Sequence, residues 1–114
     1  MAHDCVFCKI AAGEIPSSKV YEDEHVLAFR DINPVAPVHV LVIPKQHVPS
    51  VAEFGPEHDE LLSRLFAAVR KVAAETGVAE TGYRVVTNVG KDAGQQVFHV
   101  HLHVLGGRPL GPVA

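Results

Sequence analysis

The stretch that decides the fold is Val97-Phe98-His99-Val100-His101-Leu102-His103-Val104-Leu105, near the C-terminal end of the chain. From His99 onward, histidines alternate strictly with aliphatic residues. Side chains at positions i and i+2 of a β-strand share a face, so the three imidazoles are expected on one side of a strand. The aliphatic residues then face a core under a helix, which leaves the imidazoles to a cleft, a metal or a partner.

Around this strand the pattern predicts four more strands and one long helix. The helix is expected over 57–76, because Pro56 suits its first turn and Gly77 its end. Its expected apolar face consists of Leu61, Leu62, Leu65, Phe66, Val69, Val72 and Ala73. The other predicted elements are a short helix over 5–12, a hairpin with strands over 19–22 and 25–30, and strands over 38–43, 83–89 and 97–105. We therefore expect one α+β domain over residues 1–114, with a five-stranded antiparallel sheet, one long helix and a short N-terminal helix.

The composition narrows the class of protein. The chain has 114 residues, a formal net charge of -3 and 47% hydrophobic residues, which predicts one globular domain with a packed core. An acidic balance disfavours broad contact with nucleic acid. The sequence contains no run of about 18 apolar residues and begins without a secretory pattern, so we expect no membrane span and a cytoplasmic location.

Two cysteines, Cys5 and Cys8, form a C-x-x-C pair. In a reducing compartment such a pair more often binds metal or does redox work than forms a disulfide. A thioredoxin-like pair should follow a strand, and no strand is predicted before Cys5. Zinc needs two more ligands, which histidines can supply. The alternative is that both cysteines are ordinary small residues at a helix start.

The loop over 90–96 precedes the histidine run and is rich in glycine and amide side chains. Backbone N–H groups in such a turn can hold anionic oxygens, so the loop and the imidazoles together predict a phosphate site. An imidazole nitrogen is a competent nucleophile at phosphorus. A metal site and a pH switch are the competing interpretations of the histidine run.

The segment 94–105, Gly-Gln-Gln-Val-Phe-His-Val-His-Leu-His-Val-Leu, closely resembles the signature of the histidine triad (HIT) superfamily. Further blocks resemble its Hint branch, so the resemblance covers nearly the whole chain. These blocks are 7–10, 14–16, 27–34, 37–39, 42–47 and 106–108. Members of this branch are homodimeric hydrolases that split purine nucleoside phosphoramidates, such as adenosine monophosphate joined to an amine or lysine, and some acyl nucleotides.

The resemblance implies a role for individual residues. His101 matches the nucleophile, which forms a nucleotidyl-histidine intermediate without a catalytic metal, and His103 and Gln96 lie beside it in the matched motif. The resemblance implies nucleotide-binding roles for Asp31 at the ribose and for Val6, Phe7, Ile10, Phe29 and Ile32 at the purine; the alternative for these five apolar residues is a plain core position. Asn88, with the backbone of Gly94 and Gln95, offers donors that can hold the phosphoryl oxygens. The alternative function is a nucleotide-sensing or adaptor dimer with little turnover.

The resemblance also implies a structural zinc ion, because many bacterial members bind zinc through an N-terminal cysteine pair and two histidines. The matching residues are Cys5, Cys8, His47 and His99. We expect one ion per chain, with His99 as a ligand rather than a reacting group.

Two features depart from the family pattern. Gln96 stands where well-studied members carry serine, and glutamine is a poor acid for protonating a leaving group. The tail over 109–114 lacks the tryptophan that shapes substrate choice in some relatives. His3, His25 and His58 match no motif and are expected at the surface.

Overall fold

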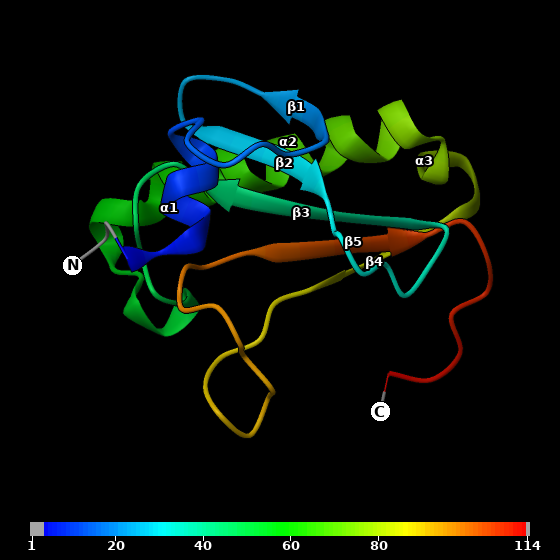
Figure 1. The fold of residues 1–114 in the computed structure, drawn as a ribbon. Helices are drawn as coiled ribbons and strands as arrows, with labels where there is room; N and C mark the ends of the chain where they lie inside the picture. The colour runs from blue at the N-terminus through cyan, green and yellow to red at the C-terminus, as the bar shows by residue number, and fades with distance from the viewer. Residues whose placement is uncertain (1–3, 114) are drawn as a thin grey trace.

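The computed structural model describes residues 4–113 and contains a five-stranded antiparallel sheet with strand order β1-β2-β3-β5-β4 (Figure 1). The strands are β1 Lys19–Glu22, β2 Val26–Arg30, β3 Val38–Pro44, β4 Tyr83–Val86 and β5 Leu102–Gly106. The helices are α1 Val6–Ala11, α2 Asp59–Thr76 and α3 Val78–Thr81, with 3₁₀ turns at Val51–Glu53 and Pro56–His58. The predicted α+β class is confirmed.

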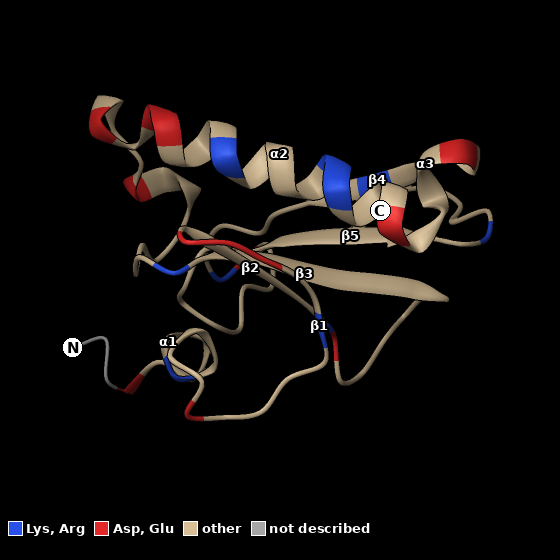
Figure 2. Cartoon of the chain, turned by 90° about the horizontal axis from the view of Figure 1, so that it is seen from above, with Lys and Arg blue, Asp and Glu red and all other residues tan. Residues whose placement is uncertain are grey.

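Helices α1 and α2 lie on opposite faces of the sheet (Figure 2). Alternate residues of β2, β3 and β5, namely Val26, Ala28, Val40, Val42, Leu102 and Val104, pack with α2. The intervening residues Leu27, Phe29, Leu41 and Ile43 pack with Phe7 and Ile10 of α1. The sheet is therefore buried on both sides, and the α1 side carries the histidines.

Helix α2 begins after the Pro56 turn and ends at Gly77, whose φ of 84° is the left-handed conformation that glycine adopts without strain. Leu65, Val69 and Val72 are buried, and each contributes roughly 1.5–3 kcal/mol by leaving water. Leu62 and Phe66 are 36% and 41% exposed, so the predicted apolar face is too broad. Only one stripe of α2 can reach the sheet.

None of the helices within residues 4–113 is both long and apolar enough to cross a membrane.

Strand β5 begins later than predicted. The sequence predicts a strand over 97–105, whereas regular pairing starts only at Leu102. Upstream, the Val100 N–H donates to the Val48 carbonyl (2.7 Å), and the Thr87 hydroxyl donates to the His101 carbonyl (2.9 Å). These bonds replace the ladder, and β4 correspondingly ends at Val86 instead of residue 89. His99 and His101 therefore stand on irregular backbone that leads into β5.

The histidines outside the expected motifs are not all free surface groups. His58 stacks on Phe54, and its Nδ1 accepts from the Gly55 N–H (3.0 Å), so only 13% of the side chain is exposed. The expectation of a surface position is wrong for His58 because it helps to build the turn before α2. The His25 side chain is 42% exposed, as expected. His3 lies outside the described residues.

Candidate active site and metal centre

A pocket of about 860 Å³ opens between α1, the α1 face of the sheet and the histidine run. Its wall includes all twelve residues that the sequence assigned to catalysis or nucleotide binding. They are Val6, Phe7, Ile10, Phe29, Asp31, Ile32, Asn88, Gly94, Gln95, Gln96, His101 and His103. Segments far apart in the chain thus meet at one cavity.

Helix α1 forms the apolar wall of this pocket. Cys5 caps the helix, because its sulfur accepts from the Cys8 N–H (3.4 Å). Phe7 is buried and meets Phe29 edge-on, with ring centroids 5.6 Å apart. Its ring also meets the His101 imidazole edge-on, at 5.1 Å. The apolar wall is therefore in direct contact with the histidine expected to react.

His101 is 8% exposed and held in one orientation by its neighbour's backbone. Its Nδ1 lies 2.8 Å from the His99 carbonyl oxygen, which can only accept, so Nδ1 carries the hydrogen. In a neutral ring the lone pair then belongs to Nε2. A neutral His101 lining the pocket is thus held as the tautomer that a nucleophile at phosphorus requires.

His103 lies next to His101, with ring centroids 5.0 Å apart. Desolvation by burial, with further contributions from His101 and His39, lowers the pKa of His103 to about 4. His103 is therefore neutral at pH 7. It lines the pocket while its Nδ1 lies 2.9 Å from Nε2 of His39.

Asp31 places a carboxylate in the pocket wall, close to His39 and His103. Its Oδ1 accepts from the Asn33 N–H (2.8 Å), and its Oδ2 lies 3.3 Å from His39 Nε2. About 20% of the side chain is exposed, so an acceptor-only group remains accessible. A sugar hydroxyl is the kind of donor that such a group binds.

The loop before the histidine run is tied together by Gln95. Its amide oxygen accepts from the Gly90 N–H (2.8 Å), and its amide nitrogen donates to the carbonyls of Pro49 (2.8 Å) and Val97 (3.1 Å). The Gln95 side chain is thus occupied in holding the loop, and its hydrogens are not free for a ligand. Gln96 is exposed and Asn88 half-buried, and both line the pocket.

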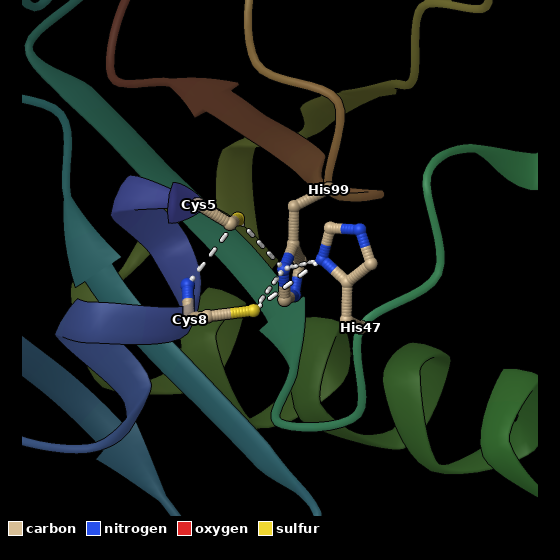
Figure 3. Close-up of side chains that lie close together, drawn as sticks. All are labelled: Cys5, Cys8, His47 and His99. Carbon is tan, nitrogen blue, oxygen red and sulfur yellow. Dashed lines mark hydrogen bonds between the residues drawn. The ribbon is translucent and has the colours of Figure 1, made fainter. Parts of the chain in front are cut away.

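The four predicted zinc ligands, from three separate segments, converge beside the pocket (Figure 3). The distances are 3.3 Å from Cys5 Sγ to His99 Nδ1, 3.3 Å from Cys8 Sγ to His47 Nδ1, and 3.2 Å between the two Nδ1 atoms. Ideal zinc bond lengths give tetrahedron edges of about 3.3 Å between two nitrogens and about 3.5 Å between nitrogen and sulfur. The donor set and its spacing therefore fit a tetrahedral Zn²⁺ ion.

Burial and hydrogen bonds around the four residues set the protonation of His99 and Cys8. His99 is fully buried, and its Nε2 donates to the Pro44 carbonyl (2.8 Å), which leaves the Nδ1 lone pair facing the cysteines. Burial lowers the pKa of His99 to about 4, so the ring stays neutral. Burial and the neighbouring Cys5 raise the pKa of the Cys8 thiol to about 11, so a metal must displace its proton.

Residues 12–110 match the family model of the HIT domain. The chain belongs to the HIT family. A purine nucleoside phosphoramidase of Escherichia coli K12 is 48% identical over 113 residues, which is 99% of this chain and 95% of that protein. A HIT family hydrolase structure from Clostridium thermocellum has a TM-score of 0.95 at 52% identity, covering 98% of this chain and 97% of that one. The structure of a histidine triad protein from Clostridium difficile has a TM-score of 0.93 at 50% identity, covering 97% of this chain and 96% of that one.

Ser17 and His39 have no role in the sequence-based prediction, although Ser17 lines this HIT pocket and His39 contacts two of its lining residues, Asp31 and His103. Ser17 lines the pocket, and its Oγ is the one buried side-chain oxygen or nitrogen in residues 4–113 with no hydrogen-bond partner. His39 reaches the same site from β3, where the aliphatic run around it obscures it. Its position on the Leu41 side of the strand alternation is a signal that could have identified it.

Proposed function

We propose that this HIT protein hydrolyses purine nucleoside phosphoramidates, of the type in which adenosine monophosphate is joined to an amine or lysine. The observation that carries the proposal is the contact of His101 Nδ1 with the His99 carbonyl, which places a hydrogen on Nδ1 and leaves the lone pair of a neutral ring on Nε2, in a residue that lines the pocket. The name of the Escherichia coli relative supports this substrate class.

The reaction that we propose has two displacements. His101 Nε2 forms a bond to the α-phosphorus while the P–N bond breaks, giving a nucleotidyl-histidine and the amine. Water then attacks phosphorus, the P–Nε2 bond breaks, and His101 is restored. One water is consumed: a hydrogen ends on the amine and a hydroxyl on phosphorus. Acyl nucleotides fit the same scheme, because attack at phosphorus would release a carboxylate instead.

The pocket supports each part of such a substrate. Phe7 and Phe29 offer apolar surface to a purine, and Asp31 offers an acceptor to ribose hydroxyls. His103, Asn88 and the loop backbone at Gly94 line the region for the phosphate. Fixed donors there would stabilise charge developing on the phosphoryl oxygens.

The experiment is hydrolysis of an adenosine phosphoramidate by wild type and His101→Asn. We expect wild type to turn over and to show a mass increase of one adenylyl group after acid quench. His101→Asn should show neither, with an unchanged circular dichroism spectrum. His25→Asn, at a side chain 42% exposed, is the matched control and should behave as wild type. Full turnover by His101→Asn would overturn the role of His101.

The alternative function, a nucleotide-sensing or adaptor dimer, is favoured by one residue. Gln96 lines the pocket at the position expected to assist the leaving group, and its amide can donate a hydrogen bond but is too weak an acid to protonate an amine. Tight binding of adenosine monophosphate with neither adduct nor turnover would identify a sensor.

We also propose that Cys5, Cys8, His47 and His99 hold one structural zinc ion per chain. The convergence of the four donor atoms supports it, and both cysteines are free thiols. Thiolate ligands need a reducing compartment, in keeping with the expected cytoplasmic location. Metal analysis of protein purified without added metal should give one equivalent, which the Cys5→Ala/Cys8→Ala variant loses. Zinc-free wild type would refute the site.

A homodimer is the assembly that we propose. Strand β4 ends the strand order, so one of its edges is unpaired within residues 4–113. Tyr83 on β4 and Phe66 on α2 are 38% and 41% exposed, which supplies apolar surface for a second copy. Sedimentation should give twice the 12.3 kDa chain mass, and Phe66→Glu should shift it toward one chain. A wild-type monomer at all concentrations would contradict the dimer.

A further inference from the structure

Ser17 places an unpartnered hydroxyl in the wall of the pocket. The residue lines the cavity, and its Oγ is the one buried side-chain oxygen or nitrogen in the described part of the chain that lacks a hydrogen-bond partner. Buried hydroxyls are nearly always paired, because a hydroxyl that leaves water without gaining a partner costs free energy. The ligand-free protein carries this cost, and a polar atom of a bound ligand would offset it.

The segment that carries Ser17 connects α1 to β1 and is held near both of its ends. On the α1 side, the Glu14 N–H donates to the Lys9 carbonyl (2.9 Å). On the β1 side, the Arg30 N–H donates to the Ser18 carbonyl (2.9 Å), which ties the segment to the end of β2. The backbone is therefore fixed without a ligand, and the hydroxyl needs only to choose among the staggered positions of one torsion, χ1.

The surroundings of this segment indicate which part of a ligand the hydroxyl would meet. Ile15, two residues upstream, packs against the cluster that includes Phe7 and Phe29. These two rings are the apolar surface proposed for the purine. A purine is apolar on its two faces and carries its ring nitrogens and its exocyclic group at its edge. Apolar side chains suit the faces, and Ser17 adds a hydroxyl that suits the edge.

We propose that Ser17 is a specificity-determining residue, whose hydroxyl forms a hydrogen bond with a polar atom at the edge of the bound purine. The identity of the ligand rests on the proposed function. Ser17 takes no part in either displacement at phosphorus. A hydroxyl both donates and accepts, so it can pair with a ring nitrogen, with an exocyclic amine or with an exocyclic oxygen.

The binding test is calorimetric titration of wild type and Ser17→Ala with adenosine monophosphate and with ribose monophosphate, which has no base. We expect Ser17→Ala to bind adenosine monophosphate on the order of 10-fold more weakly, as for loss of one hydrogen bond, and ribose monophosphate as well as wild type does. Unchanged affinity for adenosine monophosphate would overturn the proposal, as would equal weakening of both ligands.

Ser63→Ala is the matched control, because it removes the same hydroxyl from an exposed position on α2. It should bind both ligands as wild type does. A loss of adenosine monophosphate affinity in Ser63→Ala as large as that in Ser17→Ala would overturn the assignment, since the effect would then not depend on the pocket.

Urea unfolding of the ligand-free protein separates recognition from a structural role. Ser17→Ala removes a buried hydroxyl that has no protein partner, so no hydrogen bond is lost. We expect the variant to unfold at the same urea concentration as wild type or at a higher one. A clear loss of stability would show that the hydroxyl already has a partner in the free protein, and would overturn the proposal.

Base analogues identify the partner atom. The ligands are monophosphates of adenosine analogues, each with one ring nitrogen replaced by CH or with the amine replaced by hydrogen. We expect one analogue to bind wild type about as weakly as Ser17→Ala binds adenosine monophosphate, and to lose nothing further in Ser17→Ala. If Ser17→Ala weakened every analogue as much as it weakens adenosine monophosphate, the hydrogen bond to the base would be refuted.

Turnover distinguishes this proposal from the proposed function. For an adenosine phosphoramidate, Ser17→Ala should raise KM and leave kcat near wild type, because the base contact is the same in the ground state and the transition state. Turnover by wild type with an unchanged KM in Ser17→Ala would refute the role of Ser17 alone. Base-dependent binding through Ser17 without any turnover would refute the hydrolysis and leave the role of Ser17 intact.

Discussion

The Phe7 ring meets the His101 imidazole edge-on, with ring centroids 5.1 Å apart and planes at 89°. In the sequence Phe7 lies between Cys5 and Cys8, two of the four proposed zinc ligands. The first turn of α1 and its N-cap thus carry two of the proposed zinc ligands and pack against the imidazole of the proposed nucleophile. We therefore expect that loss of the cysteine pair disturbs the His101 position and that truncation of Phe7 disturbs the proposed zinc site.

Phe7→Ala should destabilise the protein by about 3 kcal/mol, because it leaves a cavity against Phe29 and His101. Adenosine monophosphate should also bind more weakly, because the pocket loses apolar wall. Urea unfolding and nucleotide titration measure the two effects. Phe98→Ala makes the same change at a residue 56% exposed and should cost less than about 0.5 kcal/mol. Equal costs for the two variants would contradict the packing of α1.

Zinc affinity should rise with pH. Burial, together with Cys5, raises the pKa of Cys8 to about 11, so the thiol is protonated at pH 7 and the metal must displace that proton. Each displaced proton makes the apparent affinity increase by about tenfold per pH unit below the thiol pKa. Competition with a chromophoric chelator across about pH 6.5 to 8.5 measures this. An affinity that does not change with pH would show that no thiol proton is displaced.

Acid should destabilise the metal-free protein in part through His103. Its folded pKa is about 4, below the unfolded value of about 6.5, so the unfolded chain binds the proton first. The contribution of His103 to the unfolding free energy is fully present above about pH 6.5. It falls by up to about 1.4 kcal/mol per pH unit as the pH drops toward 4. His103→Asn keeps a polar side chain beside His39 and cannot titrate. Its unfolding free energy should fall less steeply with acid than that of wild type; parallel curves would contradict a neutral, buried His103.

Gln95 and Gln96 should separate stability from catalysis. Gln95→Leu leaves the Gly90 N–H and the Pro49 and Val97 carbonyls without partners and should cost about 2–3 kcal/mol in urea unfolding. Gln96→Leu alters an exposed neighbour and should change stability by less than about 0.5 kcal/mol while lowering kcat. Similar unfolding curves for the two variants would contradict the bonding of Gln95.

The sequence predicts most of this fold because the decisive patterns are local. Alternation from His99 to Val104 and the spacing of Leu65, Val69 and Val72 each assign a buried face from neighbouring residues alone. Several results depend on contacts between distant segments. The start of β5 at Leu102 depends on Val48 and Thr87, which satisfy backbone groups that a ladder would otherwise bind.

The candidate site is likewise predicted in its membership but not in its long-range contacts. The resemblance selects twelve residues that line one pocket and four that form one cluster. It does not say which protein groups each of these side chains hydrogen-bonds with. That the Gln95 amide bonds to Pro49 is visible only once residues 46 positions apart are brought together. The link from Val35 through His39 to His103 likewise crosses from β3 to β5, and the composition of either strand gives no sign of it.

The two-residue alternation along 99–104 also restricts how the protein can change. His101, the proposed nucleophile, and the buried residues Val100 and Val104 occupy opposite sides of a single segment. Deleting or inserting one residue there would exchange the sides, placing imidazoles beneath α2 and valines in the pocket. Substitutions can alter reactivity or packing one position at a time, but any change of length in this segment would abolish both together.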